Sequence, residues 1–291
     1  MAIFEEVTRK KSKARIALVG PSGAGKTLSA LLMAFGITSD WKKIALIDTE
    51  HERGRFYAER GDFNIGKFLY APLYPPYSPD RYIDFVNSAA QAVGNDGVVI
   101  VDSFSHAWDN EGGVLDIKNE IAKKKPGNNS FSAWDEAGKV QNGLINSILS
   151  VPCHTIVTMR TKMAYAMEVN DKGKTVPVKI GLAPVQRENA EYEFDVVLQI
   201  NREHIACASK DTTFLDSWSG VITAELGKQL AAWLDDGEEP VRCADCDRAI
   251  MPTEKFSVAD IVSRGTEKFG RVLCSSCAKK AVEDAAKTVS E

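Results

Sequence analysis

Residues 20–27 have the residue types and the spacing that are needed to hold a triphosphate. They read Gly-Pro-Ser-Gly-Ala-Gly-Lys-Thr and match the pattern G-x-x-x-x-G-K-[ST] in full. Glycines in such a loop let consecutive backbone N–H groups turn toward the phosphates, and a helix that follows adds its dipole. The lysine bridges the β and γ phosphates, and the threonine hydroxyl ligates Mg²⁺. The predicted nucleotide-binding residues are Gly20, Pro21, Ser22, Gly23, Ala24, Gly25, Lys26 and Thr27.

Two further carboxylates could complete such a site. Asp102 ends a run of four apolar residues and is the expected partner of Mg²⁺, together with Thr27. It is followed by Ser103, so the adjacent glutamate that some ATPases use as a base is not there. Glu50 ends a neighbouring apolar run and could orient a water molecule for attack on the γ-phosphate. Asp48 is a weaker candidate because it lies deeper in that run, and a structural role for Glu50 as a cap or ion-pair partner stays open.

Four of the six cysteines form two C-x-x-C pairs near the end of the chain, Cys243 with Cys246 and Cys274 with Cys277. Four thiolates suit tetrahedral Zn²⁺ and leave no open position for catalysis, so structural zinc is favoured over redox chemistry. A segment of about 50 residues cannot readily bury a core alone, so metal binding would supply its folding energy. Apolar residues with helical spacing from 256 to 262 predict a helix or hairpin between the two pairs.

The nucleotide-binding residues need a sheet that brings several strand ends to one edge. Apolar runs at 14–19, 44–47, 98–101 and 155–159 alternate with helical patterns that begin near residues 28, 79 and 132. A glycine-rich and basic loop is expected after Asp102. This alternation predicts an α/β fold with a mostly parallel central sheet covered on both faces. Beyond it we expect a hairpin over 164–180, strands at 194–200 and 205–209, and a helix at 223–234.

Composition and charge limit the other possibilities. The chain has 291 residues, 44% of them hydrophobic, and a net charge of −4, so binding to nucleic acid or a membrane must come from local patches. No apolar run is long enough to span a bilayer, and the charged N-terminus lacks a signal core, so we expect a cytoplasmic protein. Residues 235–240 are acidic and without apolar content. We predict a core at 1–234, an acidic linker at 235–241 and a zinc-ribbon-like module at 242–291.

Residues 47–51 (Ile-Asp-Thr-Glu-His) and 56–58 (Phe-Tyr-Ala) resemble the corresponding stretch of bacterial RecA, and residues 101–103 (Val-Asp-Ser) resemble its magnesium motif. By this resemblance Glu50 is the catalytic glutamate and Tyr57 stacks on adenine. Gly54 stands where RecA has an acidic residue near the adenine, which affects base selectivity.

A closer resemblance is to phage-encoded RecA-like ATP-binding proteins that act in single-strand annealing and recombination. It is carried by residues 102–108, 158–162 and 191–195 and extends over about 14–215. It implies a RecA-like P-loop NTPase core that uses ATP and Mg²⁺ on single-stranded DNA in the host cytoplasm. It also implies a homo-oligomeric ring or filament, with a single-strand-binding protein as a further candidate partner.

RecA-like proteins place a DNA-binding loop just after the strand that ends near Arg160. Residues 160–187 contain six basic against two acidic residues on an otherwise acidic chain. Binding of DNA phosphates there would depend strongly on salt. Arg160 could sense the γ-phosphate, although a solvated hairpin with ordinary lysines is the alternative for the segment. The predicted DNA-binding residues are Lys162, Lys172, Lys174, Lys179 and Arg187.

Lys210 follows the strand at 205–209, where RecA-type filaments carry lysines that reach a neighbour's γ-phosphate. Asp211 follows it instead of a second basic residue, so this catalytic role stays open. His106 is interpreted as structural. The function that the residues favour is ATP-dependent binding and pairing of single-stranded DNA. The alternatives are an ATP-dependent regulator or assembly factor with little turnover, whose zinc module recruits a protein, and a small-molecule kinase, which the lack of an arginine-rich lid disfavours.

Overall fold

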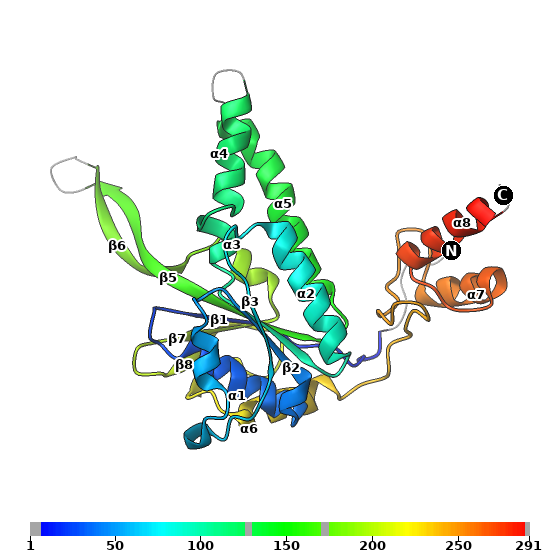
Figure 1. Cartoon of the computed structure of the whole chain (residues 1–291), viewed down its shortest axis with the longest axis horizontal. Coiled ribbons are helices and arrows are strands. Elements are labelled where there is room, and N and C mark those ends of the chain that lie inside the picture. The colour runs from blue at the N-terminus through cyan, green and yellow to red at the C-terminus, as the bar shows by residue number, and fades with distance from the viewer. Residues whose placement is uncertain (1–6, 126–129, 170–174, 289–291) are drawn as a thin grey trace. The chain divides into compact units, whose positions relative to one another are not determined.

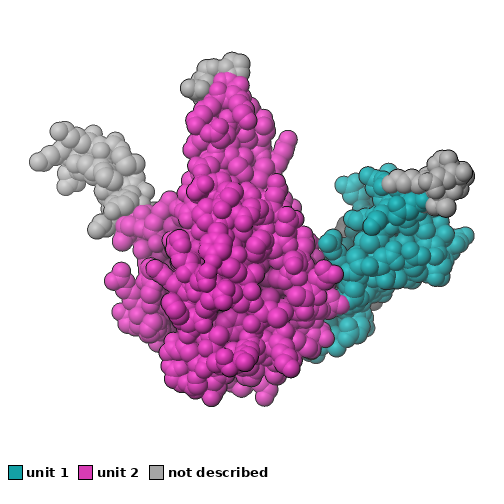
Figure 2. All heavy atoms as spheres, in the orientation of Figure 1, with its two compact units in different colours: residues 1–12, 234–291 teal, residues 13–233 magenta. Residues whose placement is uncertain are grey.

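The structure is a computed structural model that describes residues 7–125, 130–169 and 175–288. It divides the chain into two compact units, residues 13–233 and residues 1–12 with 234–291 (Figure 2).

Nine strands of the described residues form one sheet in the larger unit. Their order is β3-β2-β4-β5-β1-β7-β8-β9, and β6 pairs with β5 only. The neighbours from β3 to β7 are parallel, whereas β6, β8 and β9 pair antiparallel. The strands are β1 (Arg15–Gly20), β2 (Ile44–Asp48), β3 (Leu69–Pro72), β4 (Val98–Asp102), β5 (His154–Val169), β6 (Thr175–Pro184), β7 (Val196–Ile200), β8 (Ala206–Asp211) and β9 (Ser219–Gly220). The predicted α/β fold with a mostly parallel central sheet is confirmed.

Helices cover both faces of this sheet, with α2 and α5 on one face and α1 and α6 on the other (Figure 1). Burial on both faces explains why β1, β2 and β4 are continuous apolar runs rather than alternating ones. A Cβ at Gly36 would lie 1.9 Å from the carbonyl oxygen of Ala224, so glycine allows α1 and α6 to pack closely. The helices of this unit are α1 (Lys26–Thr38), α2 (Pro79–Val93), α3 (His106–Asp109), α4 (Val114–Lys124), α5 (Ser130–Ser150) and α6 (Ala224–Leu234).

The segment after Asp102, which was predicted to be a loop, contains the helices α3 and α4. The loop prediction was wrong for α4, because Val114, Ile117 and Ile121 recur at the spacing of one helix face. Packing against α5 stabilises α4. The described part of α5 begins at Ser130, two residues before the predicted start.

The predicted strand at 155–159 and the first arm of the predicted hairpin are one strand, β5. β6 returns antiparallel to it, with Thr175 opposite Val169. The pair of strands extends away from the sheet (Figure 1). The turn expected around residues 170–173 lies outside the described residues.

The smaller unit joins the predicted acidic linker to the basic start of the chain. Arg9 pairs with Asp236 and Lys11 with Glu239, at 2.9 and 2.7 Å. The backbone of Glu238 also accepts from the N–H of Lys11 and donates to the carbonyl of Arg9. Segment 235–241 is therefore hydrogen-bonded to another part of its own unit. Exposed ion pairs of this kind contribute little to stability.

The rest of the smaller unit contains two helices, α7 (Val258–Phe269) and α8 (Ser275–Thr288). Ser257 and Asp260 form a capping box that starts α7, and Gly270 ends it in the left-handed conformation. Of the two alternatives predicted between the cysteine pairs, a helix or a hairpin, the structure has the helix. None of the described helices in either unit has the length and apolar content to cross a membrane.

Candidate nucleotide and metal sites

The loop between β1 and α1 presents its backbone and Lys26 to a common cleft. Gly23 and Gly25 have φ values of 80° and 85°, which glycine adopts without strain. The Nζ atom of Lys26 donates to the carbonyls of Gly20 at 2.9 Å and Pro21 at 2.8 Å. Burial lowers the pKa of Lys26, and the nearby carboxylates of Asp102 and Glu50 oppose this effect. The ammonium group is therefore held over the loop that would surround the phosphates.

Asp102 and Thr27 are in direct contact at the carboxyl end of β4. The hydroxyls of Thr27 and Thr158 each donate to a different oxygen of Asp102, at 2.5 Å. Burial raises the pKa of Asp102, and these two hydrogen bonds oppose the increase. A carboxylate and a hydroxyl are the hard oxygen donors that Mg²⁺ prefers. Thr27 and Asp102 could therefore hold this ion between them.

Glu50 forms a bidentate ion pair with Arg160 in the middle of β5. Nε of Arg160 donates to Oε1 of Glu50 at 2.7 Å, and Nη2 donates to Oε2. Burial opposes ionisation of Glu50, but the hydrogen bonds and charge of Arg160 hold its pKa below the ordinary value. The structure thus pairs the predicted base with the predicted phosphate sensor. Glu50 therefore forms an ion pair, which was the structural alternative, and it also lines the cleft.

Asp48 has a different environment from Glu50, although both follow the same apolar run. It is 1% exposed and accepts from the N–H groups of Glu50 and Gly54 at 2.6 and 2.8 Å. It also accepts from the hydroxyl of Tyr70 at 2.9 Å. Asp48 therefore fixes the backbone turn that carries Glu50 toward the cleft and is not itself among the residues that line it.

These groups surround a cleft with a volume of about 460 Å³. Tyr57 is among the residues that line it, and its stacking on adenine stays a prediction. Arg53, Phe56 and Arg60 also line the cleft and were missed by the sequence analysis, although they flank Tyr57 in the sequence. The guanidinium of Arg60 lies 5.8 Å from the centre of the Tyr57 ring. This aromatic and cationic wall is suited to a nucleobase and its phosphates.

Comparison with known protein families agrees with this geometry. Residues 12–230 match a family described as an AAA domain. The chain belongs to this family of AAA domains. The match includes the phosphate loop, both carboxylates and the hairpin, and it supports ATP binding and, in general, ATPase activity. No curated protein matches the chain.

Lys210 of the AAA domain does not line the nucleotide cleft. Its Nζ atom donates to the carbonyl of Phe194 at 2.7 Å and to that of Tyr192. Within its own chain Lys210 therefore closes the short 3-10 turn at Ala190–Glu193. Its role toward a neighbouring copy stays a prediction.

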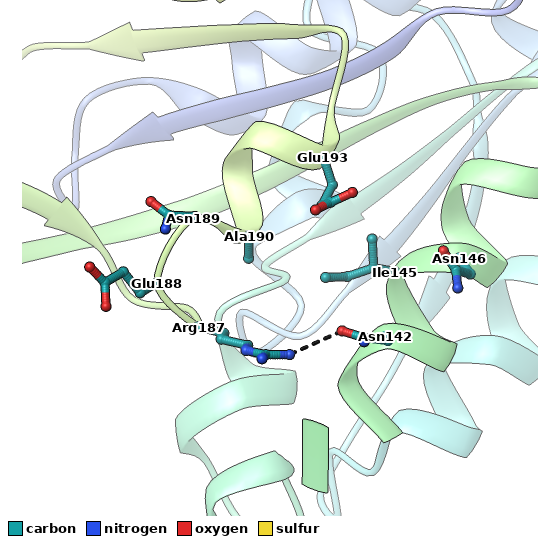
Figure 3. Close-up of a pocket in the computed structure, with 8 residues that line it drawn as sticks. All are labelled: Asn142, Ile145, Asn146, Arg187, Glu188, Asn189, Ala190 and Glu193. Carbon is teal, nitrogen blue, oxygen red and sulfur yellow. Dashed lines mark hydrogen bonds between the residues drawn. The ribbon is translucent and has the colours of Figure 1, made fainter. Parts of the chain in front are cut away.

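The predicted DNA-binding residues of the AAA domain lie in different places. Lys162 is exposed on β5, Lys179 is on β6 opposite Tyr165, and Lys172 and Lys174 lie outside the described residues. Figure 3 shows Arg187 beyond the hairpin, pointing toward Asn142 of α5, to which it donates at 3.0 Å. It lines a polar cavity of about 390 Å³ there. Arg187 is thus part of a different surface from the hairpin strands.

The four cysteines of the smaller unit lie together, beyond the part of the chain that matches the AAA family. Their Sγ atoms are all within 4.8 Å of one another, and those of Cys246 and Cys274 are 3.6 Å apart. Tetrahedral Zn²⁺ requires sulfur atoms about 3.8 Å apart. Burial opposes ionisation of Cys243, but N–H groups of Cys274, Asp245 and Cys246 outweigh this effect and lower its pKa to about 6, whereas burial and the neighbouring thiols raise the pKa values of Cys246 and Cys277. Four sulfur atoms at this spacing match the donor set of the ion. The cluster could therefore hold a metal ion through thiolates.

Proposed function

We propose that the chain is a RecA-like ATPase that uses ATP to bind and pair single-stranded DNA, as in phage recombination and annealing. The observation that carries this proposal is the course of β5. One uninterrupted strand supplies Thr158 to Asp102 and Arg160 to Glu50, and then continues into the hairpin with β6. A movement of Arg160 would therefore reach the hairpin through a continuous strand rather than through a loop.

The residues of the cleft have complementary tasks in hydrolysis. The loop N–H groups and Lys26 hold the triphosphate, and Mg²⁺ between Thr27 and Asp102 would neutralise charge on it. Glu50 orients the attacking water and accepts its proton. Because Arg160 occupies both oxygens of Glu50, the carboxylate is a weak base until the guanidinium turns to the γ-phosphate. Binding of the complete triphosphate thereby activates the base.

The DNA part of the proposal is based on the basic segment and the resemblance to RecA-like proteins. Lys162, together with lysines 172, 174 and 179 and Arg187, would neutralise DNA phosphates. The same resemblance supports a ring or filament in which Lys210 reaches the γ-phosphate of a neighbour. A single-strand-binding protein is a candidate partner, and Zn²⁺ bound by the four cysteines would stabilise the C-terminal module.

The deciding experiment measures ATP turnover at low salt with and without single-stranded DNA. We expect DNA to raise the turnover of the wild type several-fold, and Lys26→Ala to lose ATP binding and turnover in both conditions. Lys67→Ala, which changes an exposed lysine away from the cleft, serves as the control. If single-stranded DNA neither binds nor alters turnover, the proposed function is wrong and only the nucleotide site stands.

One observation favours a second candidate, an ATP-dependent regulator or assembly factor with little turnover. In the described structure both oxygens of Glu50 are engaged by Arg160, which suits a protein that binds ATP without rapid hydrolysis. Normal ATP binding with negligible turnover, unchanged by Glu50→Gln, would favour this function. A loss of turnover by about 100-fold in Glu50→Gln, with binding retained, would favour the ATPase.

A further inference from the structure

His106 is a buried side chain next to Glu50 that has no part in the hydrolysis steps assigned to Lys26, Glu50 and Arg160. It belongs to α3, is 3% exposed, and its ring centre lies 5.2 Å from that of Tyr77. Its Nδ1 atom lies 2.7 Å from Oγ1 of Thr49. Its Nε2 atom has no hydrogen-bond partner among the described residues and lies 4.0 Å from Oε1 of Glu50. A buried polar atom without a partner costs about 1–3 kcal/mol, so its position requires an explanation.

The surroundings favour the tautomer of His106 in which Nε2 carries the proton. Oγ1 of Thr49 already accepts from the N–H of Ser103 at 2.8 Å. Its hydroxyl has two acceptors in reach, Nδ1 of His106 at 2.7 Å and the carbonyl of Ser103 at 3.3 Å, and Nδ1 is the nearer. Nε2–H then faces the carboxylate of Glu50. The other tautomer would place a nitrogen lone pair opposite that negative charge, which is repulsive. Nε2 is therefore a donor that lies just beyond hydrogen-bonding distance of the proposed base.

We propose that His106 is a positioning residue that holds Glu50 for catalysis through its Nε2–H group. The inference rests on the proposed role of Glu50 as the base. Arg160 is 39% exposed and lines the cleft, so it can turn to the γ-phosphate, whereas His106 is fixed in the core. Glu50, which is 16% exposed, then loses both N–H donors. A shift of its carboxylate by about 1 Å brings Oε1 within reach of Nε2 and leaves Oε2 free for water.

This exchange of partners gives Glu50 two states with different chemistry. Two charged N–H donors from Arg160 stabilise the carboxylate and weaken it as a base. A single neutral donor from His106 fixes the orientation of the Glu50 carboxylate and lowers its basicity less than Arg160 does. Lys26 is the other cation near Glu50, but it is needed for the phosphates. His106 is thus suited to keep the base in place after Arg160 has left.

Two substitutions separate positioning from simple packing. His106→Gln places an amide nitrogen near the position of Nε2 and keeps a donor toward Glu50, whereas His106→Asn places its amide near Nδ1 and keeps only the contact with Thr49. We expect His106→Asn to lower kcat for ATP hydrolysis by about 10-fold or more with the Kd for ATP unchanged. His106→Gln should retain most of the activity. Wild-type kcat in His106→Asn, or equal losses in both variants, would overturn the proposal.

A second measurement does not depend on turnover. The chain has four histidines, so ¹⁵N NMR can assign the ring nitrogens of His106. We expect the Nε2–H tautomer, and in Arg160→Gln a slowly exchanging Nε2 proton, because Glu50 then turns to His106. Adding Glu50→Ala should restore fast exchange. An Nδ1–H tautomer, or no change in Arg160→Gln, contradicts the proposal. If the wild type has no ATPase activity but the hydrogen bond from His106 to Glu50 forms in Arg160→Gln, the proposed function is refuted and the contact between these two residues stands.

Discussion

The nucleotide cleft and the four-cysteine module depend on their site residues in opposite ways. The cleft residues lie at the ends of strands β1, β2 and β4, whose interiors are fully buried against helices on both faces. In the module the core consists of Cys243, Ile250 and Leu273, and the other three cysteines pack against it. A functional side chain of the cleft can therefore be changed while the sheet persists. In the module the proposed metal ligands are themselves a large part of the core.

The largest effect should follow removal of one module cysteine. Cys246→Ser leaves three thiolates, and we expect the module to lose Zn²⁺ and unfold, because metal binding supplies most of its folding energy. Residues 13–233 should stay folded and bind ATP. Limited proteolysis, zinc content and ATP binding measure these three outcomes.

Cys207→Ser is the matched control for this substitution, since Cys207 is an exposed free cysteine on β8 of the other unit. It should change none of the three measurements. A module that keeps its protease resistance in Cys246→Ser, or after treatment with a chelator, would contradict the comparison between the two regions.

The stability of the larger unit should depend on pH through His154. Nδ1 of His154 accepts from the N–H of Ala14 at 3.0 Å, and burial, reinforced by Lys13 and Arg15, lowers its pKa to about 3. A histidine in the unfolded chain titrates near 6.5, so below that pH the unfolded state binds one more proton. The stabilisation is complete above pH 6.5 and is lost as the pH falls toward 3. At pH 4.5 the loss amounts to about 3 kcal/mol.

Urea unfolding of the wild type and His154→Asn at pH 7.5 and pH 4.5 measures this contribution. Asparagine keeps an acceptor for the N–H of Ala14 but does not titrate. The free energy of unfolding should therefore fall by about 3 kcal/mol less between the two pH values in the variant. An equal fall in both proteins would show that His154 is not the titrating group.

Sequence reasoning succeeded where a feature depends on neighbouring residues and failed where it depends on strand order. The apolar runs before Glu50 and Asp102 are each a few residues long, and both predicted strands are present as β2 and β4. The ion pair between Glu50 and Arg160 joins residues 110 positions apart. It forms because β4 lies between β2 and β5, and no local pattern gives that order.

Helix α4 is a different case, because Val114, Ile117 and Ile121 have helical spacing and the loop prediction overlooked them. The distance along the chain does explain why the contacts of the N-terminal segment were not predicted. Arg9 and Lys11 carry charges opposite to those of segment 235–241, but the pairing spans more than two hundred residues. His106 was interpreted as structural because the amino-acid sequence does not show that its Nε2 atom faces Glu50.

Asp48 and Glu50 are neighbouring carboxylates, and substituting each one tests whether a residue of the cleft region affects stability or turnover. Asp48→Asn removes at least one of three hydrogen bonds, so we expect a loss of about 1–3 kcal/mol in the free energy of unfolding. ATP affinity should fall as well, because the turn that Asp48 fixes leads to Tyr57. Glu50→Gln breaks the ion pair with Arg160 at the edge of the cleft, so it should cost less stability than Asp48→Asn while it lowers turnover by about 100-fold. Chemical denaturation and ATP titration of both variants test this, and equal losses of stability would contradict it.

The smallest effect is expected at the hairpin. It differs from both the cleft and the four-cysteine module, because it is an extension of β5 and has no separate core. Lys162→Ala removes one exposed cation, so single-stranded DNA binding should weaken a few-fold and the salt slope should fall by about 0.7. Stability and ATP binding should not change, since Lys162 lies outside the cleft. Lys228→Ala, an exposed lysine of α6 on the sheet face away from α5, is the control. If Lys162→Ala leaves the salt slope unchanged, the hairpin is a solvated surface and the DNA-binding residues lie elsewhere.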